Sequence, residues 1–173
     1  PNIDRIAREG VEQDQFYVFP MCSPTRAGLM TGRYPMRFGM ARAVIPPWRH
    51  FGLDPAELTL PEALGKLGYA QRGIFGKWHL GMPTARQPHK PTPSEHGFDY
   101  WFATANNAQP SHRNPRNFFK NGKPVGELKG YACDLVVEDA IQWLDSRKET
   151  ERPFFLNVWF HEPHAPLAAP PDL

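Results

Sequence analysis

The stretch around Cys22 combines a thiol with a nearby arginine at the start of a short expected helix. The sequence predicts this helix over 24–31, with Ser23 as its N-cap and Gly32 as its terminator. Cys22 would then precede the helix, where free backbone N–H groups and the positive end of the helix dipole favour an anion. Arg26 on the first turn adds a planar cation with several donors. The pattern therefore predicts a binding corner for a tetrahedral oxyanion.

The longer sequence context of Cys22 bears on its role. On its own, a cysteine near a helix start is more often a small buried apolar group than a reactive one. However, the run Cys22-Ser-Pro-Thr-Arg26, followed by Leu29 and the segment Thr31-Gly-Arg33, resembles the signature of type I sulfatases, Cys-x-Pro-x-Arg and then Leu-x-Thr-Gly-Arg. The resemblance implies that Cys22 is oxidised to formylglycine (3-oxoalanine), an aldehyde whose hydrate attacks sulfate esters.

A second run, Gly76-Lys-Trp-His-Leu-Gly81, resembles the second sulfatase signature at every position. By resemblance, Lys77 and Arg26 would steady the hydrate and bind sulfate, and His79 would assist the second hydroxyl of the hydrate. Outside such a motif, a lysine at this position would be an ordinary surface residue. The resemblance departs just upstream of the motif, where the chain carries Gln-Arg and is one residue longer than usual.

A third run near the end of the chain contains two histidines. The segment Pro163-His-Ala-Pro-Leu167 resembles the family segment Pro-His-x-Pro-Leu, which makes His164 rather than His161 the histidine that binds sulfate or the leaving group. The two histidines are three residues apart and could instead be metal ligands. No further Cys or His spacing supports a zinc site.

Each of the three motifs follows an expected β-strand. Aromatic, β-branched or apolar runs predict strands over 11–19, 69–75 and 153–160. Ligands of open α/β sheets bind beyond the carboxyl ends of the strands, so the motifs are expected to meet there. The order of elements predicts an α/β fold. The resemblance further implies the alkaline-phosphatase-like sandwich, with a mostly parallel sheet covered by helices.

Helices and one long loop are expected between these strands. Thr59 and Glu62 predict a capping box at one helix start, and apolar residues at helical spacing predict a helix over 135–148. Asn2 is expected to cap a short N-terminal helix. The polar stretch 106–123 fits either a sugar-binding loop or a solvated excursion, and we favour the solvated interpretation.

Composition and charge limit the class of protein and the partners that it can bind. Of 173 residues, 40% are hydrophobic and 22% are charged, as in a folded domain. The net charge of +2 is too small to indicate nucleic-acid binding, and no stretch approaches the roughly 18 apolar residues of a membrane span. Cys22 and Cys133 could pair, although they are far apart in sequence. We expect residues 1–173 to be part of a single sulfatase catalytic domain, without its first strand and its C-terminal portion.

The resemblance also implies a substrate, a cofactor and partners. The arylsulfatase and N-acetylgalactosamine-sulfate sulfatase branches are the most similar, so the expected substrate is a sulfated carbohydrate or an aryl sulfate. The family metal is calcium or magnesium, held by oxygen ligands, and residue 22 in its modified form is the only ligand that we can name. A formylglycine-generating enzyme would act during maturation. Such sulfatases work in the periplasm, outside the cell or in lysosomes.

Two other functions stay open. A phosphonate or phosphate monoester hydrolase of the same superfamily can share the Cys-x-Pro-x-Arg element. A non-catalytic relative would bind sulfate or carbohydrate without turnover. We expect the isolated 173 residues to be inactive, because their metal cage would be incomplete.

Overall fold

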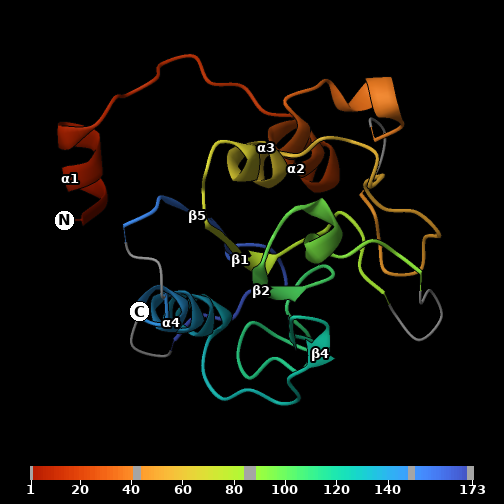
Figure 1. Ribbon diagram of the computed structural model, residues 1–173. Coiled ribbons are helices and arrows are strands. Elements are labelled where there is room, and N and C mark those ends of the chain that lie inside the picture. Colours follow the sequence, from red (N-terminus) through yellow and green to blue (C-terminus); the bar gives the residue numbers. More distant parts are fainter. Residues whose placement is uncertain (1, 41–43, 84–88, 148–150, 171–173) are drawn as a thin grey trace.

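The computed structural model describes residues 2–40, 44–83, 89–147 and 151–170. Within them, a five-stranded sheet lies between helices (Figure 1). The elements in chain order are α1 (Asn2–Glu9), α2 (Cys22–Thr31), the 3-10 helix η1 (Pro35–Phe38), α3 (Leu60–Lys66), β1 (Gln71–Lys77), the 3-10 helix η2 (Pro93–His96), β2 (Tyr100–Thr104), β3 (Phe119–Lys120), β4 (Lys123–Pro124), α4 (Ala132–Asp145) and β5 (Phe154–Trp159).

The centre of the sheet is parallel. The strand order is β4-β3-β2-β1-β5, and β1 pairs in parallel with both β2 and β5. Phe75 in β1 lies opposite Phe102 on one side and Val158 on the other. The short strands β3 and β4 add an antiparallel edge beside β2. The predicted strands over 69–75 and 153–160 are confirmed, with β1 shifted toward the Lys77 motif.

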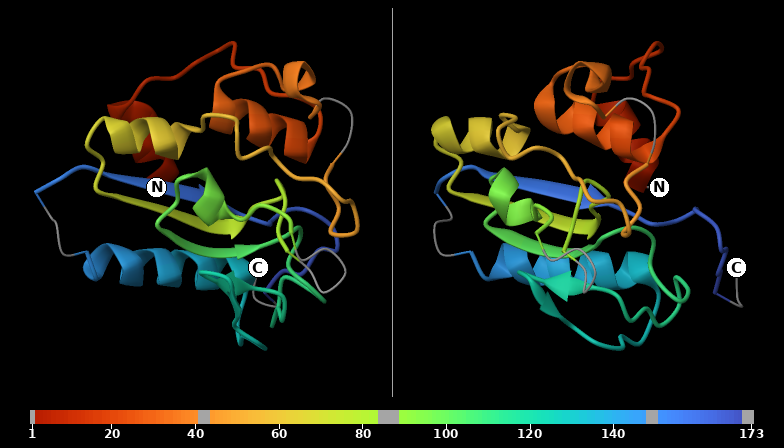
Figure 2. Two further views of the ribbon diagram at one scale, coloured as in Figure 1. Left: turned by 45° about the vertical axis from the view of Figure 1, so that its right-hand side comes forward. Right: turned by 90° about the vertical axis from the view of Figure 1, so that its right-hand side faces the viewer.

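Helices cover both faces of the sheet (Figure 2). Successive residues of a strand point to opposite faces, and Ile74 and Phe75 each supply one core. Ile74 packs in the core that includes Met30 of α2, whereas Phe75 packs with Val136 and Trp143 of α4. Burial on both faces agrees with the largely apolar runs of β2 and β5, whereas β1 carries polar residues at both ends around the buried Ile74 and Phe75. The predicted α/β fold class is confirmed.

The expected strand over 11–19 is wrong. This segment is irregular and connects α1 to α2 outside the sheet (Figure 1). Phe16 and Tyr17 are 70% and 84% exposed, and α1 itself carries no buried residue. β-propensity stabilises a strand only where neighbouring strands pair with it and bury one face. Residues 11–19 have the propensity but are not paired in the sheet.

The start of α2 also differs from the prediction. The helix begins at Cys22, and Met21 is its N-cap without a side-chain hydrogen bond. Ser23 is therefore not the N-cap. Its buried hydroxyl donates to the carbonyl oxygen of His79 at 2.8 Å and accepts from the backbone N–H of Ile45 at 2.9 Å. Cys22 thus lies in the first helical turn, and the predicted terminator, Gly32, ends the helix in the left-handed region.

The other helix predictions are confirmed, apart from their ends. The predicted N-terminal helix is α1, but Asn2 is its first helical residue and not its N-cap. Thr59 and Glu62 form the predicted capping box of α3. The helix predicted over 135–148 corresponds to α4, which begins earlier and ends at Asp145; residue 148 lies outside the described residues. No helix in the described ranges is long and apolar enough to span a bilayer.

Candidate active site

A cleft of about 570 Å³ opens beyond the carboxyl ends of β1 and β5. Its walls come from residues 19–29, from the end of β1 and from residues 159–164. The ionisable side chains that line it are Cys22, Arg26, Lys77, His161, Glu162 and His164. The three motifs therefore share one cleft, as predicted. Cys22 reaches it from a loop-to-helix junction rather than from the end of a strand.

Lys77 lies at the base of the site and contacts Cys22. The Lys77 Nζ is 3.8 Å from the Cys22 Sγ and donates to the Asn107 Oδ1 at 2.7 Å. The lysine is only 2% exposed. Burial lowers the pKa of Lys77, Cys22 opposes this shift, and Arg26 adds to it. Cys22 and Cys133 are both free thiols, so the possible disulfide between them is not formed.

Arg26 adds a second, oriented cation. Its Nη1 donates to the carbonyl oxygen of Lys77 at 2.6 Å, and its guanidinium lies 4.4 Å from the centre of the Trp159 ring. Burial lowers the pKa of Arg26 to about 10, so the group stays charged at neutral pH. Stacking and the hydrogen bond fix the plane of the guanidinium. Two cations thus converge beside residue 22, where an anion would be stabilised.

Gly76 allows the strands to approach at this point. Its φ is 101°, and a Cβ atom there would overlap the carbonyl oxygen of Trp159 on β5. Only glycine adopts such a backbone without strain. Glycine is therefore needed at position 76 for a structural reason, because it lets β1 approach β5 and places Lys77 beside the end of β5.

His79 lies close to the cations but is not among the residues that line the cleft. It is buried and adopts a φ of 57°, in the left-handed region. Burial lowers its pKa to about 3, and the charges of Lys77, Arg26 and His164 act in the same direction. Among the described residues, neither ring nitrogen has a hydrogen-bond partner. The imidazole is therefore neutral at pH 7 and adds no third positive charge beside Arg26 and Lys77.

The two histidines after β5 differ in their surroundings. The buried His161 places its Nε2 2.7 Å from the Thr104 Oγ1, and this hydroxyl donates to the carbonyl oxygen of Asn106. The Thr104 oxygen therefore accepts from His161. The exposed His164 lies with its Nδ1 2.9 Å from the Asn107 Nδ2. His161 is tied to β2, whereas the ring of His164 lies at the opening of the cleft.

Asn107 is a site residue that the sequence interpretation missed. The solvated interpretation of 106–123 is wrong at Asn107 and at His112, which are 9% and 1% exposed. Asn107 links the two proposed sulfate-binding groups, since its Oδ1 accepts from Lys77 and its Nδ2 approaches His164. The signal was its position just after β2, at the same edge of the sheet as the other motifs.

The expected metal site is not formed by the part of the chain that the structure describes. Those residues contain no group of three or more His, Cys, Asp or Glu side chains that could hold a metal ion. The nearest charged neighbours of Cys22 are Arg26 and Lys77, which repel a divalent cation. These residues do not fit calcium or magnesium on their own.

Comparison with known proteins decides the family. The sulfatase family model matches residues 1–173. The chain belongs to the sulfatase family. The N-acetylgalactosamine-6-sulfatase of Mus musculus is 36% identical over 194 residues, which cover 98% of this chain and 36% of the relative. An ulvan-active sulfatase of Formosa agariphila is 32% identical over 175 residues, covering 99% of this chain and 32% of the relative.

A solved structure agrees with the sulfatase assignment. A protein of glycosaminoglycan metabolism in Bacteroides thetaiotaomicron superposes with a TM-score of 0.81 at 27% identity, covering 98% of this chain and 38% of that protein. The predicted family and its alkaline-phosphatase-like fold are thus confirmed. This sulfatase chain spans about a third of the length of the curated relatives it matches.

Proposed function

We propose that the protein carrying this chain hydrolyses sulfate esters of a sulfated carbohydrate, with residue 22 as the nucleophile after conversion to formylglycine. One observation carries the proposal. The two sulfatase signatures, which are far apart in sequence, bring the Cys22 Sγ within 3.8 Å of the Lys77 Nζ in a single cleft. The substrate class is supported by the relatives, whose names specify N-acetylgalactosamine 6-sulfate and ulvan.

Sulfate-ester cleavage needs a nucleophile, cations on the nonbridging oxygens and an acid for the leaving alkoxide. A hydrated aldehyde at residue 22 supplies one hydroxyl to attack sulfur and a second whose deprotonation releases sulfate. Arg26 and Lys77 are placed to bind the nonbridging oxygens, because both charges converge beside residue 22. Their positions are fixed before substrate arrives, which makes their charge effective in the transition state.

Proton transfer is assigned to the histidines. His79 is assigned to the second hydroxyl of residue 22. Its ring is neutral at pH 7 because burial lowers its pKa to about 3, and the negative charge of bound sulfate would raise this pKa and make the ring a better proton acceptor. His164 lies at the opening of the cleft and is placed to bind sulfate or to protonate the leaving oxygen. Arg26 and Lys77 orient the sulfate, and Asn107 holds the Lys77 ammonium in place.

Maturation and cofactor needs follow from the same proposal. Oxidation of Cys22 would require a formylglycine-generating enzyme, and the half-buried thiol lines the cleft. Calcium or magnesium, the metals expected for the family, would need ligands beyond those that the described residues gather. We further propose that the enzyme works in the periplasm, outside the cell or in lysosomes.

Two measurements on the complete protein test the proposal. Peptide mass spectrometry over Cys22 should detect an aldehyde in place of the thiol. Parallel assays should show turnover of an aryl sulfate that exceeds turnover of the matching aryl phosphate. Cys22→Ala should abolish this turnover, whereas Cys133→Ala, the matched control, should retain it per folded molecule. Preference for the phosphate ester would instead support the phosphatase alternative, and binding without turnover would support a non-catalytic relative.

A further inference from the structure

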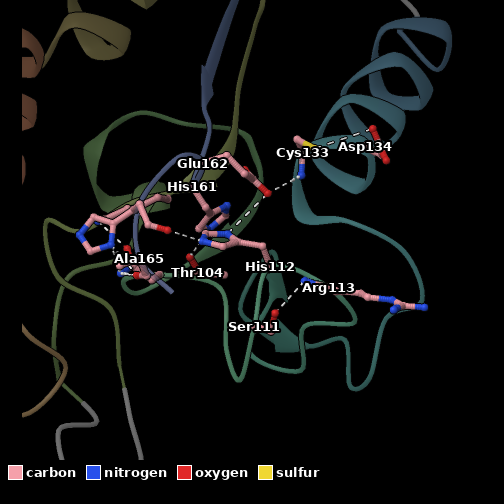
Figure 3. Close-up of polar contacts among 12 residues, drawn as sticks. Thr104, Ser111, His112, Arg113, Cys133, Asp134, His161, Glu162 and Ala165 are labelled. Atoms are coloured by element: carbon pink, nitrogen blue, oxygen red, sulfur yellow. Dashed lines mark hydrogen bonds and ion pairs between the residues drawn. The ribbon is translucent and has the colours of Figure 1, made fainter. Parts of the chain in front are cut away.

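His112 connects the loop that carries His164 to the start of α4 (Figure 3). The His112 ring is 1% exposed, and its Nε2 lies 2.7 Å from the main-chain carbonyl oxygen of His164. A carbonyl oxygen only accepts hydrogen bonds, so the Nε2 of His112 must carry the hydrogen. The contact fixes the tautomer of His112 and holds the backbone at His164.

The backbone of His112 is anchored at the start of α4. Its carbonyl oxygen accepts from the backbone N–H of Ala132, the first residue of the helix, at 2.8 Å. The next residue, Arg113, forms an isolated antiparallel bridge with Tyr131. The backbone of His112 is therefore fixed to a helix whose opposite end lies far from the cleft, and its side chain extends from this anchor toward His164.

Glu162 provides a second link between the same segments. Its Oε1 accepts from the backbone N–H of Cys133, in the first turn of α4, at 3.2 Å and lies 3.5 Å from the His112 Nδ1 (Figure 3). The ring of His164, in contrast, is exposed and contacts Asn107 and the neighbouring carbonyl oxygen. The place of this ring thus depends on how the backbone at 161–165 is held.

We infer that His112 is a positioning residue of the active site, which sets the location of the His164 ring by holding the backbone at 161–165 against α4. This inference rests on the proposed function, since it gives His112 a part in sulfate-ester cleavage without contact to the substrate. His112 does not line the main cleft. Its effect on turnover must therefore pass through residues 161–165, and we assign it to His164, whose carbonyl oxygen accepts from the His112 ring.

A double-mutant cycle in the complete protein tests this route. His112→Phe keeps a ring of similar shape and removes the donor, whereas His112→Gln keeps an N–H close to the original Nε2. We expect His112→Phe to lower kcat/KM about 10- to 100-fold, mainly through kcat, and His112→Gln to restore most of it. In a His164→Ala background, His112→Phe should cause little further loss, because residues that act as a unit are not additive.

A matched control separates positioning from stability. His96 is equally buried but packs against Trp78 in the core on the other face of the sheet, so His96→Phe should combine additively with His164→Ala. Additive losses for His112→Phe as well, or an undiminished kcat/KM in folded His112→Phe, would overturn the inference.

A spectroscopic measurement keeps this inference distinct from the proposed function. The NMR signals of the His164 ring should shift or broaden in His112→Phe and stay in place in His96→Phe, whether or not the protein turns over a substrate. Wild-type protein without sulfatase activity would reject the proposed function alone. Unchanged His164 signals in folded His112→Phe would reject the positioning role of His112 alone.

Discussion

Acidification should destabilise this domain because two buried histidines of the site region are held neutral. The pKa of His79 and that of His161 are both lowered from 6.5 to about 3, in each case chiefly by burial. In the unfolded chain both rings bind a proton near pH 6.5. Between that pH and about 3, the unfolded state therefore binds more protons than the folded state, and stability falls as the pH falls.

The size of the effect follows from the two shifts. Between the two pKa values of a histidine, each pH unit of acidification removes about 1.4 kcal/mol of unfolding free energy. At pH 5 the loss amounts to about 2 kcal/mol for each ring and about 4 kcal/mol for both. The whole unfolding free energy of a protein is typically about 5–15 kcal/mol. His96, whose pKa is also lowered by burial, acts in the same direction. Stability above pH 6.5 should be unaffected by these three groups.

Urea unfolding between pH 7.5 and pH 5 measures this dependence. His161→Gln keeps an N–H donor for Thr104 but cannot titrate, so the slope of the unfolding free energy against pH should decrease by about 1.4 kcal/mol per unit. His89→Gln is the control, since the His89 ring is exposed. An identical slope for wild-type and His161→Gln protein would refute the reasoning.

Three substitutions probe how the cations are held. Asn107→Ala removes the acceptor of the buried Lys77 ammonium, so urea titration should show a loss of about 1–3 kcal/mol in unfolding free energy. Arg26→Lys loses the planar stacking on Trp159 and should lower kcat/KM for an aryl sulfate at least about tenfold in steady-state assays of the complete protein. Gly76→Ala places a Cβ against the Trp159 carbonyl at positive φ and should cost about 2–5 kcal/mol of unfolding free energy, measured in urea.

Each of these substitutions has a matched control. Asn106→Ala is the control for Asn107→Ala. The main-chain oxygen of Asn106 accepts a hydrogen bond from Thr104, and this oxygen stays when the side chain is removed. Arg33→Lys changes an arginine that pairs with a glutamate away from the cleft lining. Gly32→Ala also adds a Cβ at positive φ but with no atom within 4 Å, so it should cost only about 1–2 kcal/mol. Equal effects of test and control would contradict the assigned contacts.

The sequence predicted those features that depend on residue identity and local periodicity. The run 153–160 is largely apolar, as expected for a strand of a sheet with covered faces, and this pattern identifies β5. The run 69–75 has only modest β propensity, and its flanking glycines identify β1. The capping box of α3 depends on two residues, Thr59 and Glu62, that contact each other locally. The motifs around Cys22 and Lys77 were likewise evident, because they are short and contiguous.

The failed predictions depend on partners that are distant in sequence. Residues 11–19 have strand propensity but are unpaired in the sheet, which no local pattern reveals. Ser23 resembles an N-cap, yet its hydroxyl bonds to His79 and Ile45 across the fold. Asn107 and His112 are polar loop residues that become buried only because tertiary partners satisfy their hydrogen bonds.

The electrostatics of the cleft favour an anion over a neutral sugar as the group bound beside residue 22. Lys77 is buried and Arg26 is half-buried. The partners that the structure describes for them are a carbonyl oxygen, an amide oxygen, a thiol and an aromatic ring, none of them a carboxylate. Buried cations without a counter-charge are costly, which is why burial lowers the pKa of both groups. The negative charge of a bound sulfate ester would offset part of this cost, whereas a neutral hydroxyl would not. Burial and the same unpaired charges keep the His79 ring neutral, and a bound anion would offset those charges and raise the pKa of the ring. Anion binding and the basicity of His79 are therefore coupled through one electrostatic arrangement.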